Sequence, residues 1–346
     1  MRPPPVADSA LIDAFGRVAS DLRISLTDKC SLRCTYCMPA EGLDWLRKVE
    51  LLTDDEIERL AGVFVSLGIT SIRLTGGEPL LHPSLPAVVA RLAALTPRPE
   101  LSLTTNGIGL VRVATQLVEA GLDRVNVSVD TLDRDRFRAL TRRDRLPEVL
   151  EGVAAAAAAG LSPVKVNAVL IRNSNFGEAP DLLGWALRAG YEMRFIEHMP
   201  LDAQHAWTRD AMVTADEMLG LLGEWYTLRA IGHGADGSAP AEEFEVLDGP
   251  SAVQWATRPG RLGVIASVTR PFCRDCDRLR LTADGQLRTC LFARTETDLR
   301  APLRAGAGDA ALAGLIRTAV AGKQAGHGID AADFVQPARP MSAIGG

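Results

Sequence analysis

This sequence of 346 residues contains no long apolar run and no excess of basic residues. No window approaches the roughly 18 apolar residues of a membrane-spanning helix. The first 20 residues lack the apolar stretch of a secretory signal, so we expect a cytoplasmic protein. The formal net charge of −5 provides no general attraction to nucleic acid or to an anionic membrane, and neither is expected as a partner. A site for an anionic ligand therefore needs its own cluster of basic side chains.

Internal repeats and low-complexity tracts are also absent. Hydrophobic residues make up 47% of the chain and charged residues 23%, which excludes a disordered protein and indicates a soluble globular one. The length is enough for one large domain or two ordinary ones.

The six cysteines are the most informative residues present, because they fall into two groups. Cytosolic thiols are kept reduced, so clustered cysteines indicate metal ligands before disulfides. The first cysteine group consists of Cys30, Cys34 and Cys37, and the second of Cys273, Cys276 and Cys290.

Strand-like and helical segments alternate from residue 21 to residue 198. Thr53 and Glu56 form a capping box at the start of one helix, which is expected to end near Gly68. Such alternation is typical of α/β proteins, in which right-handed crossovers join the strands of a parallel sheet. The six expected strands comprise residues 22–27, 70–75, 101–105, 124–130, 164–170 and 192–198.

Each of these strands ends in residues suited to chemistry, such as GGEP at 76–79 and TTNG at 104–107. The carboxyl ends of parallel strands form the active face of βα barrels and open α/β sheets. Gly, Asn and Asp are also ordinary turn residues, so a single strand end has a simple structural explanation. Six such ends in succession favour a functional face.

The pattern changes after residue 230. Residues 231–242 are small and polar, which is typical of a loop or a domain boundary. Short strand-like segments and the second cysteine group follow. A helical pattern covers residues 310–321, and the last residues are expected to be extended.

The first cysteine group has the spacing C-x3-C-x2-C. Three thiolates can hold three irons of a [4Fe–4S] cluster and leave the fourth iron open to a chelating ligand. One alternative is a helix with three buried thiols, although Lys29, Arg33 and Thr35 do not suit a buried seam. Another is zinc, for which no fourth ligand lies nearby.

The second cysteine group has the spacing C-x2-C-x13-C. Here too a fourth zinc ligand is missing, and His233 is a candidate by residue type only. Arg278 and Arg280 would project to one face of a strand, where two guanidinium groups suit a polyphosphate. The alternative is a solvated, charged strand.

DKCSLRCTYC at 28–37 and LTGGEPLL at 74–81 together resemble the radical S-adenosylmethionine (SAM) superfamily. This resemblance implies a cluster whose open iron is chelated by SAM, which is then cleaved by one electron. From about Leu11 to the last residue the chain resembles more closely the GTP 3′,8-cyclase family of molybdenum cofactor biosynthesis. The segments that carry this resemblance are LRISLTDKCSLRCTYCMP, IRLTGGEPLL, TTNG, NVSVD, VKVNAVL, RFIEHMP, PFCRDCDRLRLTADGQLRTCL and the terminal IGG.

The family resemblance implies an α/β fold, an incomplete (β/α)6 barrel of the TIM type with a C-terminal α+β region that carries a second Fe–S cluster. We expect an N-terminal arm at 1–20, the partial barrel at 21–230 and the C-terminal region at 231–346. The implied cofactors are two [4Fe–4S] clusters, one on each cysteine group, and SAM.

The resemblance also assigns site residues. Those implied for SAM are Tyr36, Gly77, Ser128 and Met199. Those implied for GTP are Arg23, Arg73, Thr104, Lys165 and the segment Arg278, Leu279 and Arg280. Arg194 could join them, because a charged residue on a strand needs a partner, although an internal salt bridge is the alternative. The terminal Gly345 and Gly346 are implied to reach into the active site, where glycine permits close approach of the backbone.

The implied activity is conversion of GTP to (8S)-3′,8-cyclo-7,8-dihydroguanosine 5′-triphosphate. The implied partners are an electron donor such as flavodoxin or ferredoxin and a downstream cyclic pyranopterin monophosphate synthase, and assembly as a homodimer is compatible with the family. Two alternatives are a peptide-modifying radical SAM maturase and a non-enzymatic protein with two zinc modules. The chain departs from the family at His82 and at Ala266-Ser267, which leaves the geometry of those loops open.

Overall fold

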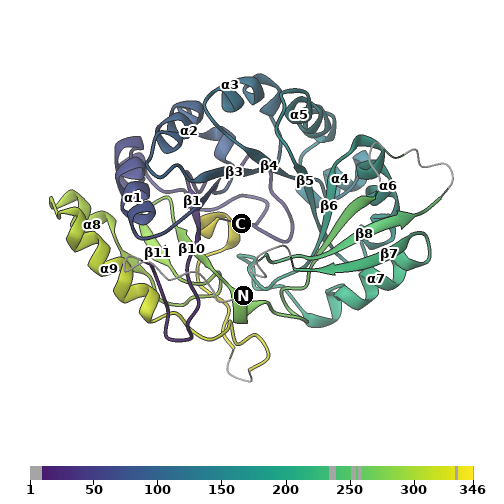
Figure 1. Cartoon of the computed structure of the whole chain (residues 1–346). Coiled ribbons are helices and arrows are strands. Elements are labelled where there is room, and N and C mark those ends of the chain that lie inside the picture. Colours follow the sequence, from purple (N-terminus) through teal and green to yellow (C-terminus); the bar gives the residue numbers. More distant parts are fainter. Residues whose placement is uncertain (1–9, 234–238, 251–254, 256–258, 332–333, 346) are drawn as a thin grey trace.

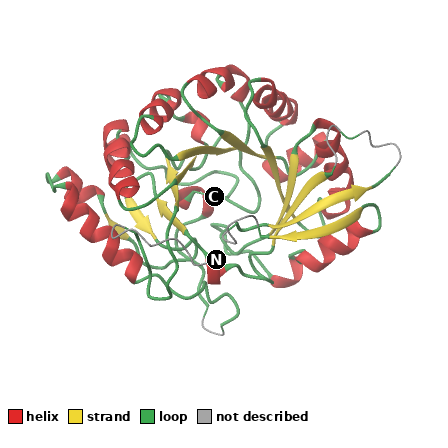
Figure 2. Cartoon of the chain, in the orientation of Figure 1, coloured by secondary structure: helices red, strands yellow, loops and turns green. Residues whose placement is uncertain are grey.

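The computed structural model describes residues 10–233, 239–250, 255, 259–331 and 334–345. They form one curved sheet of twelve strands, with helices on its outer face (Figures 1 and 2). The C-terminal end of the chain lies in the middle of the arc (Figure 1). The strand order is β12-β11-β10-β1-β2-β3-β4-β5-β6-β9-β8-β7.

Six parallel strands in chain order form the middle of the sheet. Helical crossovers connect them, as the alternation in the sequence predicts. The strands are β1 Asp21–Ser25, β2 Ser71–Thr75, β3 Glu100–Thr105, β4 Arg124–Ser128, β5 Val164–Leu170 and β6 Glu192–Glu197. The helices are α1 Asp54–Ser66, α2 Leu85–Ala93, α3 Ala114–Glu119, α4 Arg134–Thr141, α5 Leu146–Ala158 and α6 Ala179–Ala189.

The remaining strands extend this sheet at both ends. β9 pairs in parallel with β6, and β10 pairs in parallel with β1. The strands are β7 Thr227–Gly232, β8 Glu242–Asp248, β9 Gly260–Ile265, β10 Arg278–Leu281, β11 Gln286–Arg288 and β12 Thr297–Asp298. The accompanying helices are α7 Ala215–Gly223, α8 Arg300–Arg304, α9 Asp309–Ala321 and α10 Met341–Ile344.

The sequence predicts all six central strands, each within two residues of its observed bounds. The predicted capping box is also present, because the Thr53 hydroxyl accepts a bond from the Glu56 amide and the Glu56 carboxylate accepts one from the Thr53 amide.

Two expectations about the C-terminal third need their bounds corrected. The loop expected at 231–242 begins later, because residues 231 and 232 belong to β7, which pairs with β8 as one hairpin. Among the described residues of this segment, 233 and 239–241 lie outside any strand, as expected. Residues 341–344 form α10 rather than an extended chain. Its first amide donates to the carbonyl of Leu201 at 3.1 Å, a long-range contact that local sequence does not reveal.

The apolar core lies between the sheet and its helices. In β1, Leu22 and Ile24 are fully buried in this core and alternate with Arg23 and Ser25. β5 alternates in the same way between apolar and polar residues. Since alternate side chains of a strand face opposite sides, the concave inner face of the sheet is polar. That inner face is where a polar ligand could bind.

Residues from both ends of the chain share this core. Leu279 of β10 and Ile316 of α9 belong to the same buried cluster as Leu22. One continuous sheet and one core thus include residues from all parts of the chain. The division into an arm at 1–20, a barrel at 21–230 and a C-terminal region at 231–346 remains a prediction. Among the described helices, none is long and apolar enough to cross a membrane.

Candidate active site

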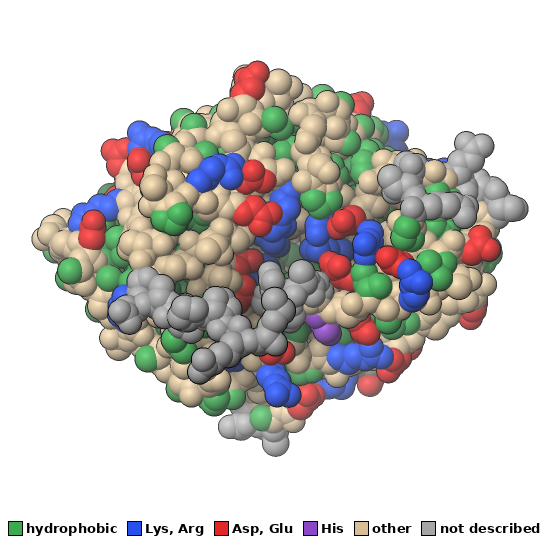
Figure 3. Space-filling model, in the orientation of Figure 1, with side chains coloured by type: hydrophobic (Ala, Val, Ile, Leu, Met, Phe, Trp, Pro, Cys, Tyr) green, Lys and Arg blue, Asp and Glu red, His purple; other side chains and the backbone are tan. Residues whose placement is uncertain are grey.

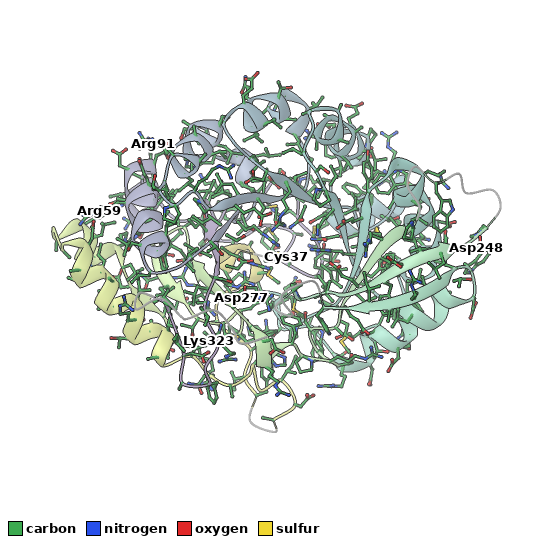
Figure 4. The ribbon with its side chains drawn as sticks, in the orientation of Figure 1. Cys37, Arg59, Arg91, Asp248, Asp277 and Lys323 are labelled. Carbon is green, nitrogen blue, oxygen red and sulfur yellow. The ribbon has the colours of Figure 1, made fainter. Side chains whose placement is uncertain are left out.

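A cavity of about 300 Å³ lies on the concave side of the sheet. All six cysteines are in its wall, although the two groups are far apart in the sequence. All six are free and partly buried. Figure 4 shows Cys37 near the middle of the arc. The fold thus brings the two predicted metal-binding groups to one space.

The first cysteine group lies on the loop that follows β1. Residues 26–47 contain no helix, so the alternative of three thiols on one buried helical face is wrong. Arg33 donates to the carbonyl of Cys30 at 2.7 Å, and Arg142 donates to the carbonyls of Arg33 and Met38 at 2.9 Å each. These guanidinium groups hold the loop in a shape that turns its thiols toward the cavity.

Burial disfavours the thiolate form in this group. It raises the pKa of Cys30 to about 11 and that of Cys37 to about 12, and it raises the pKa of Cys34 well above its usual value. Neighbouring thiols add to the rise for Cys34 and Cys37. Thiolates so placed need a cation, and coordination to iron supplies one. The chemistry of this donor set therefore fits a cluster.

The GGEP turn packs directly on the same loop. The Gly77 amide donates to the carbonyl of Thr27 at 2.7 Å, and a Cβ at Gly77 would overlap the carbonyls of Asp28 and Lys29. Glycine is therefore required by the close approach of two backbones. This turn sets the distance between the ends of β1 and β2.

Glu78 of the turn is buried and fully bonded. Its carboxylate accepts bonds from the Thr105 hydroxyl at 2.6 Å and from the amides of Asn106 and Leu80 at 2.7 and 3.0 Å. Burial raises the pKa of Glu78 to about 7. Asn106 in turn points its amide at Cys30 Sγ at 3.8 Å, so Glu78 also orients a neighbour of the first group.

Tyr36 joins two other strand ends. Its hydroxyl donates to Asp130 at 2.6 Å, and its ring meets that of His198 edge to face at 6.1 Å. Burial raises the pKa of Asp130 to about 6. Ser128 and Met199, also predicted to contact SAM, line the cavity together with Tyr36.

The second cysteine group lies on the other side of the cavity, next to β10. Burial raises the pKa of Cys273. Burial alone would also raise that of Cys276, but the positive charges of Arg278 and Lys323 lower the pKa of Cys276 to about 7. Arg278 Nη2 is 3.6 Å and Lys323 Nζ 3.7 Å from Cys276 Sγ. These two cations thus stabilise the thiolate form of Cys276, which is the form that binds metal.

His233, the candidate fourth zinc ligand, is exposed just beyond β7. Within the described ranges, no three side chains of Cys, His, Asp or Glu converge closely enough to hold one metal ion. The thiols of each group stand around the cavity instead.

The strand register aligns the predicted substrate-binding cations across the sheet. Arg23 of β1 is paired with Arg73 of β2 on one side and Arg280 of β10 on the other. Burial and the neighbouring Arg73 lower the pKa of Arg23 to about 9, and burial lowers that of Arg73 to about 10. The nearest carboxylate to Arg23 belongs to Asp21, at 3.9 Å. This row of arginines thus has little compensating negative charge, which favours an anionic ligand.

A second, more open cavity adjoins the first and has a volume of about 870 Å³. Arg23, Arg73, Arg194 and Arg278 line both cavities, which makes them a basic passage between the two. Lys165 lies in the second cavity and is paired with Glu192 at 2.9 Å. Figure 3 shows Lys, Arg, Asp and Glu side chains around a hollow in the middle of this face.

Several buried polar atoms facing this space have no hydrogen-bond partner among the described residues. They include Nε of Arg23 and Arg278 and Oδ1 of Asn167. Buried polar atoms are rarely left unpaired, so these atoms fit a polar ligand. Thr104 also lines the first cavity. Leu279 is different, because its side chain is completely buried in the apolar core between the two arginines.

The C-terminal tail enters the site from the side of β1 and β2. The Ser25 hydroxyl donates to the carbonyl of Ile344 at 3.0 Å, and Arg280 donates to the carbonyl of Gly345. Gly345 has φ +87°, and a Cβ there would overlap the Ser25 hydroxyl. Gly346 lies outside the described residues.

Sequence reasoning missed two basic residues at this site, Lys323 and Arg17. Arg17 donates to the carbonyls of Cys273 and Gln324 at 2.6 Å each and to that of Ala325 at 3.0 Å. Neither residue belongs to a strand end or a cysteine motif, so no local signal identified them.

The two departures from the family pattern have clear local contacts. His82 contacts Asp54 at 2.9 Å, and the Ser84 hydroxyl donates to the same carboxylate at 2.5 Å. The Ser267 carbonyl lies 3.0 Å from His327 Nε2.

Comparison with known proteins defines the class of this site. Residues 24–186 match the radical SAM superfamily, and residues 191–329 match the family described as Molybdenum Cofactor Synthesis C. Among solved structures, Streptococcus suis SuiB bound to S-adenosylmethionine superposes with a TM-score of 0.56 at 14% identity, over 87% of this chain and 69% of that chain. The protein is therefore a member of the radical SAM superfamily, and SuiB shows the fold alone.

Two relatives with assigned functions show which family within the superfamily the chain belongs to. GTP 3′,8-cyclase of Streptomyces coelicolor is 63% identical over 97% of this chain and 96% of the relative. GTP 3′,8-cyclase 2 of Mycobacterium tuberculosis (strain H37Rv) is 58% identical over 97% of this chain and 92% of the relative. The chain belongs to the GTP 3′,8-cyclase family.

Proposed function

We propose that this protein converts GTP to (8S)-3′,8-cyclo-7,8-dihydroguanosine 5′-triphosphate, the first step of molybdenum cofactor biosynthesis. The observation that carries the proposal is the convergence of both cysteine groups and a row of buried arginines on one cavity. The identity of 58–63% to two GTP 3′,8-cyclases, over nearly the whole chain, supports the same reaction.

As a radical SAM enzyme, the protein uses a [4Fe–4S] cluster and SAM, and we assign the cluster to the thiols of Cys30, Cys34 and Cys37. When bound, this cluster supplies the electron that cleaves SAM and starts the radical reaction joining C3′ of the GTP ribose to C8 of guanine. Tyr36, Gly77, Ser128 and Met199 are assigned to SAM. Gly77 would act by keeping the turn after β2 close to the cysteine loop, and Tyr36 by its bond to the end of β4.

The basic passage is assigned to the triphosphate. Arg23 and Arg73 lie on the adjacent strands β1 and β2, Thr104 lies on β3, and Lys165 lies further along the sheet on β5, where Glu192 already pairs with it. Arg194 is 3.9 Å from its nearest carboxylate, that of Glu243. A polyanion placed between the arginines would supply the counter-charge that they lack. The passage would then point the base and ribose into the first cavity.

The second cysteine group is assigned to another [4Fe–4S] cluster that meets the guanine. Arg278 and Arg280 flank that position on β10, while Leu279 can contribute only its backbone there. The role of the protein is orientation of SAM and GTP and exclusion of water, since the cofactors supply the difficult chemistry. Gly345 and Gly346 are assigned to the wall of the active site.

The proposal also includes partners, location and assembly. An electron donor such as flavodoxin or ferredoxin would reduce the clusters, and a cyclic pyranopterin monophosphate synthase would use the product. The protein would work in the cytoplasm as a homodimer. The alternative of a peptide-modifying maturase is disfavoured, because the relatives that are 58–63% identical over nearly the whole chain are GTP 3′,8-cyclases.

The test is anaerobic incubation of the reconstituted protein with SAM, a reductant and GTP. We expect 5′-deoxyadenosine and the cyclised nucleotide to form together in equal amounts. Omission of GTP, or replacement by ATP, is the matched control. Deoxyadenosine formed equally with and without GTP, and no cyclised nucleotide, would contradict the proposed substrate. Two equivalents of zinc and no iron in anaerobically purified protein would contradict the radical mechanism itself.

A further inference from the structure

Lys323 follows α9 and is almost completely buried, with 5% of its surface exposed. Its ammonium group donates to the carbonyl of Cys276 at 2.8 Å and to that of Arg278 at 3.1 Å. The same nitrogen is 3.7 Å from Cys276 Sγ. Two of these three contacts are with Cys276 and the third is with Arg278, two residues further along the chain. Figure 4 shows this lysine on the side of the arc formed by α9.

Lys323 has no carboxylate partner among the described residues. Every ion pair found there involves another cation. A buried ammonium without a counter-charge is strongly disfavoured, so this group needs an anion at the cysteine loop. The sulfur of Cys276 is the atom in the right place.

Arg17 provides an instructive contrast on the same loops. It also bridges the cysteine loop and the segment after α9, but its guanidinium is paired with the carboxylate of Asp13 at 2.5 Å, in addition to its bonds to backbone carbonyls and its position over the Phe15 ring. Arg17 is therefore a neutralised structural clamp. Lys323 joins the same two segments and places an uncompensated charge at a sulfur.

We propose that Lys323 is a positioning residue for the second cluster, which fixes Cys276 as a ligand and raises the reduction potential of that cluster. The inference rests on the second cluster assigned above. A cluster gains negative charge when it takes up an electron, and a nearby cation or hydrogen bond to a ligand sulfur stabilises the reduced form. In the test, the electron comes from dithionite, and no bond forms or breaks.

The experiment is a potentiometric titration followed by electron paramagnetic resonance. The full-length chain with alanine at Cys30, Cys34 and Cys37 keeps a single cluster, and the holoenzyme provides the comparison. We expect Lys323→Met to lower the equilibrium constant for reduction at least about tenfold, which is about 59 mV for one electron. Lys323→Arg keeps the charge and should stay near the parent value. Lys48→Met, at an exposed lysine, is the matched control.

The outcomes separate the inference from the function on which it rests. Iron bound in Lys323→Met with an unchanged potential would overturn the role of Lys323. Iron bound by Lys323→Arg but lost from an otherwise folded Lys323→Met would support it. If Lys323→Met does not fold, Lys323→Gln replaces it in the titration, because glutamine keeps a hydrogen-bond donor but carries no charge. An unchanged reduction potential in Lys323→Gln would again refute the role of Lys323. Absence of iron from the parent would instead refute the second cluster.

Discussion

Gly345 offers the sharpest test of how the tail contributes to the site. Its φ of +87° and ψ of +113° lie in a region open to glycine and strained for other residues. A Cβ would overlap the Ser25 hydroxyl and lie 2.8 Å from Thr75 Cγ2. Gly345→Ala should therefore displace the tail from the ends of β1 and β2.

The backbone strain alone costs on the order of 1–3 kcal/mol. If the tail is released by a local opening, this shifts the balance between docked and released tail by about 5–150-fold. The overlap with Ser25 adds to this energetic cost, because the Ser25 hydroxyl also donates to the carbonyl of Ile344 at 3.0 Å and cannot move freely. Loss of the bond from Arg280 to the Gly345 carbonyl would also favour the released tail.

Hydrogen exchange followed by mass spectrometry measures this release. The amides of Met341 and Gly345 donate to the carbonyls of Leu201 and Met341, so their protection reports docking. We expect exchange to accelerate by the factor above and formation of the cyclised nucleotide to fall. Gly306→Ala is the control, because Gly306 has φ +85° but no atom within 4 Å of a Cβ.

Unchanged tail exchange in Gly345→Ala would refute the reasoning from strain and overlap. Faster exchange with full product formation would show that the docked tail is dispensable for the reaction. Equal effects of Gly345→Ala and Gly306→Ala on tail exchange would indicate a global loss of stability instead.

Four further predictions address other parts of the molecule. Cys276→Ser should still cleave SAM to 5′-deoxyadenosine but form no cyclised nucleotide, and a wild-type yield would contradict the two-cluster assignment. Arg194→Met should raise the KM for GTP about tenfold or more, since a bond to a charged group contributes ~1.5–3 kcal/mol, and should leave the Kd for SAM unchanged. Glu197→Gln should destabilise the fold by roughly 1.5–3 kcal/mol in urea unfolding. The reason is that the buried carboxylate accepts bonds from the amides of Ala215, Val268 and Thr269 at 2.8–2.9 Å, whereas an amide group would oppose some of these donors. Finally, burial raises the pKa of Asp284, but the bonds and charge of Arg339 outweigh burial and hold this pKa below its usual value of 3.8. The pair therefore stabilises the protein fully above pH 3.8, and this stabilisation is lost as the pH falls through the lowered pKa. Asp284→Asn should thus lower the Tm at pH 7, with a difference that is constant down to about pH 5 and shrinks below about pH 4.

Local sequence patterns were enough to predict the six central strands and to pick out the residues suited to metal and anion binding. Strand positions follow from runs of apolar residues and their alternation, as in Leu22 and Ile24 around Arg23, because these patterns are local. The spacing of Cys30, Cys34 and Cys37 indicates an open-iron cluster for the same reason. GGEP at 76–79 could be recognised as a motif at a strand end, but the close packing of Gly77 on the backbone of Asp28 and Lys29, 48 to 49 residues earlier, became visible only in the fold.

How these parts contact one another depends on long-range pairing that no local pattern encodes. Cys276 and Lys323 are 47 residues apart, and Arg280 and Gly345 are 65 apart. Their contacts exist because β10 pairs with β1 in parallel and the tail folds back as α10, neither of which leaves a periodic signal. The surroundings then change what each thiol does: burial raises the pKa of Cys37 to about 12, whereas the charges of Arg278 and Lys323 outweigh burial and lower the pKa of Cys276 to about 7. Local pattern identifies a thiol, but the burial and the charges that the fold packs around it set its ionisation.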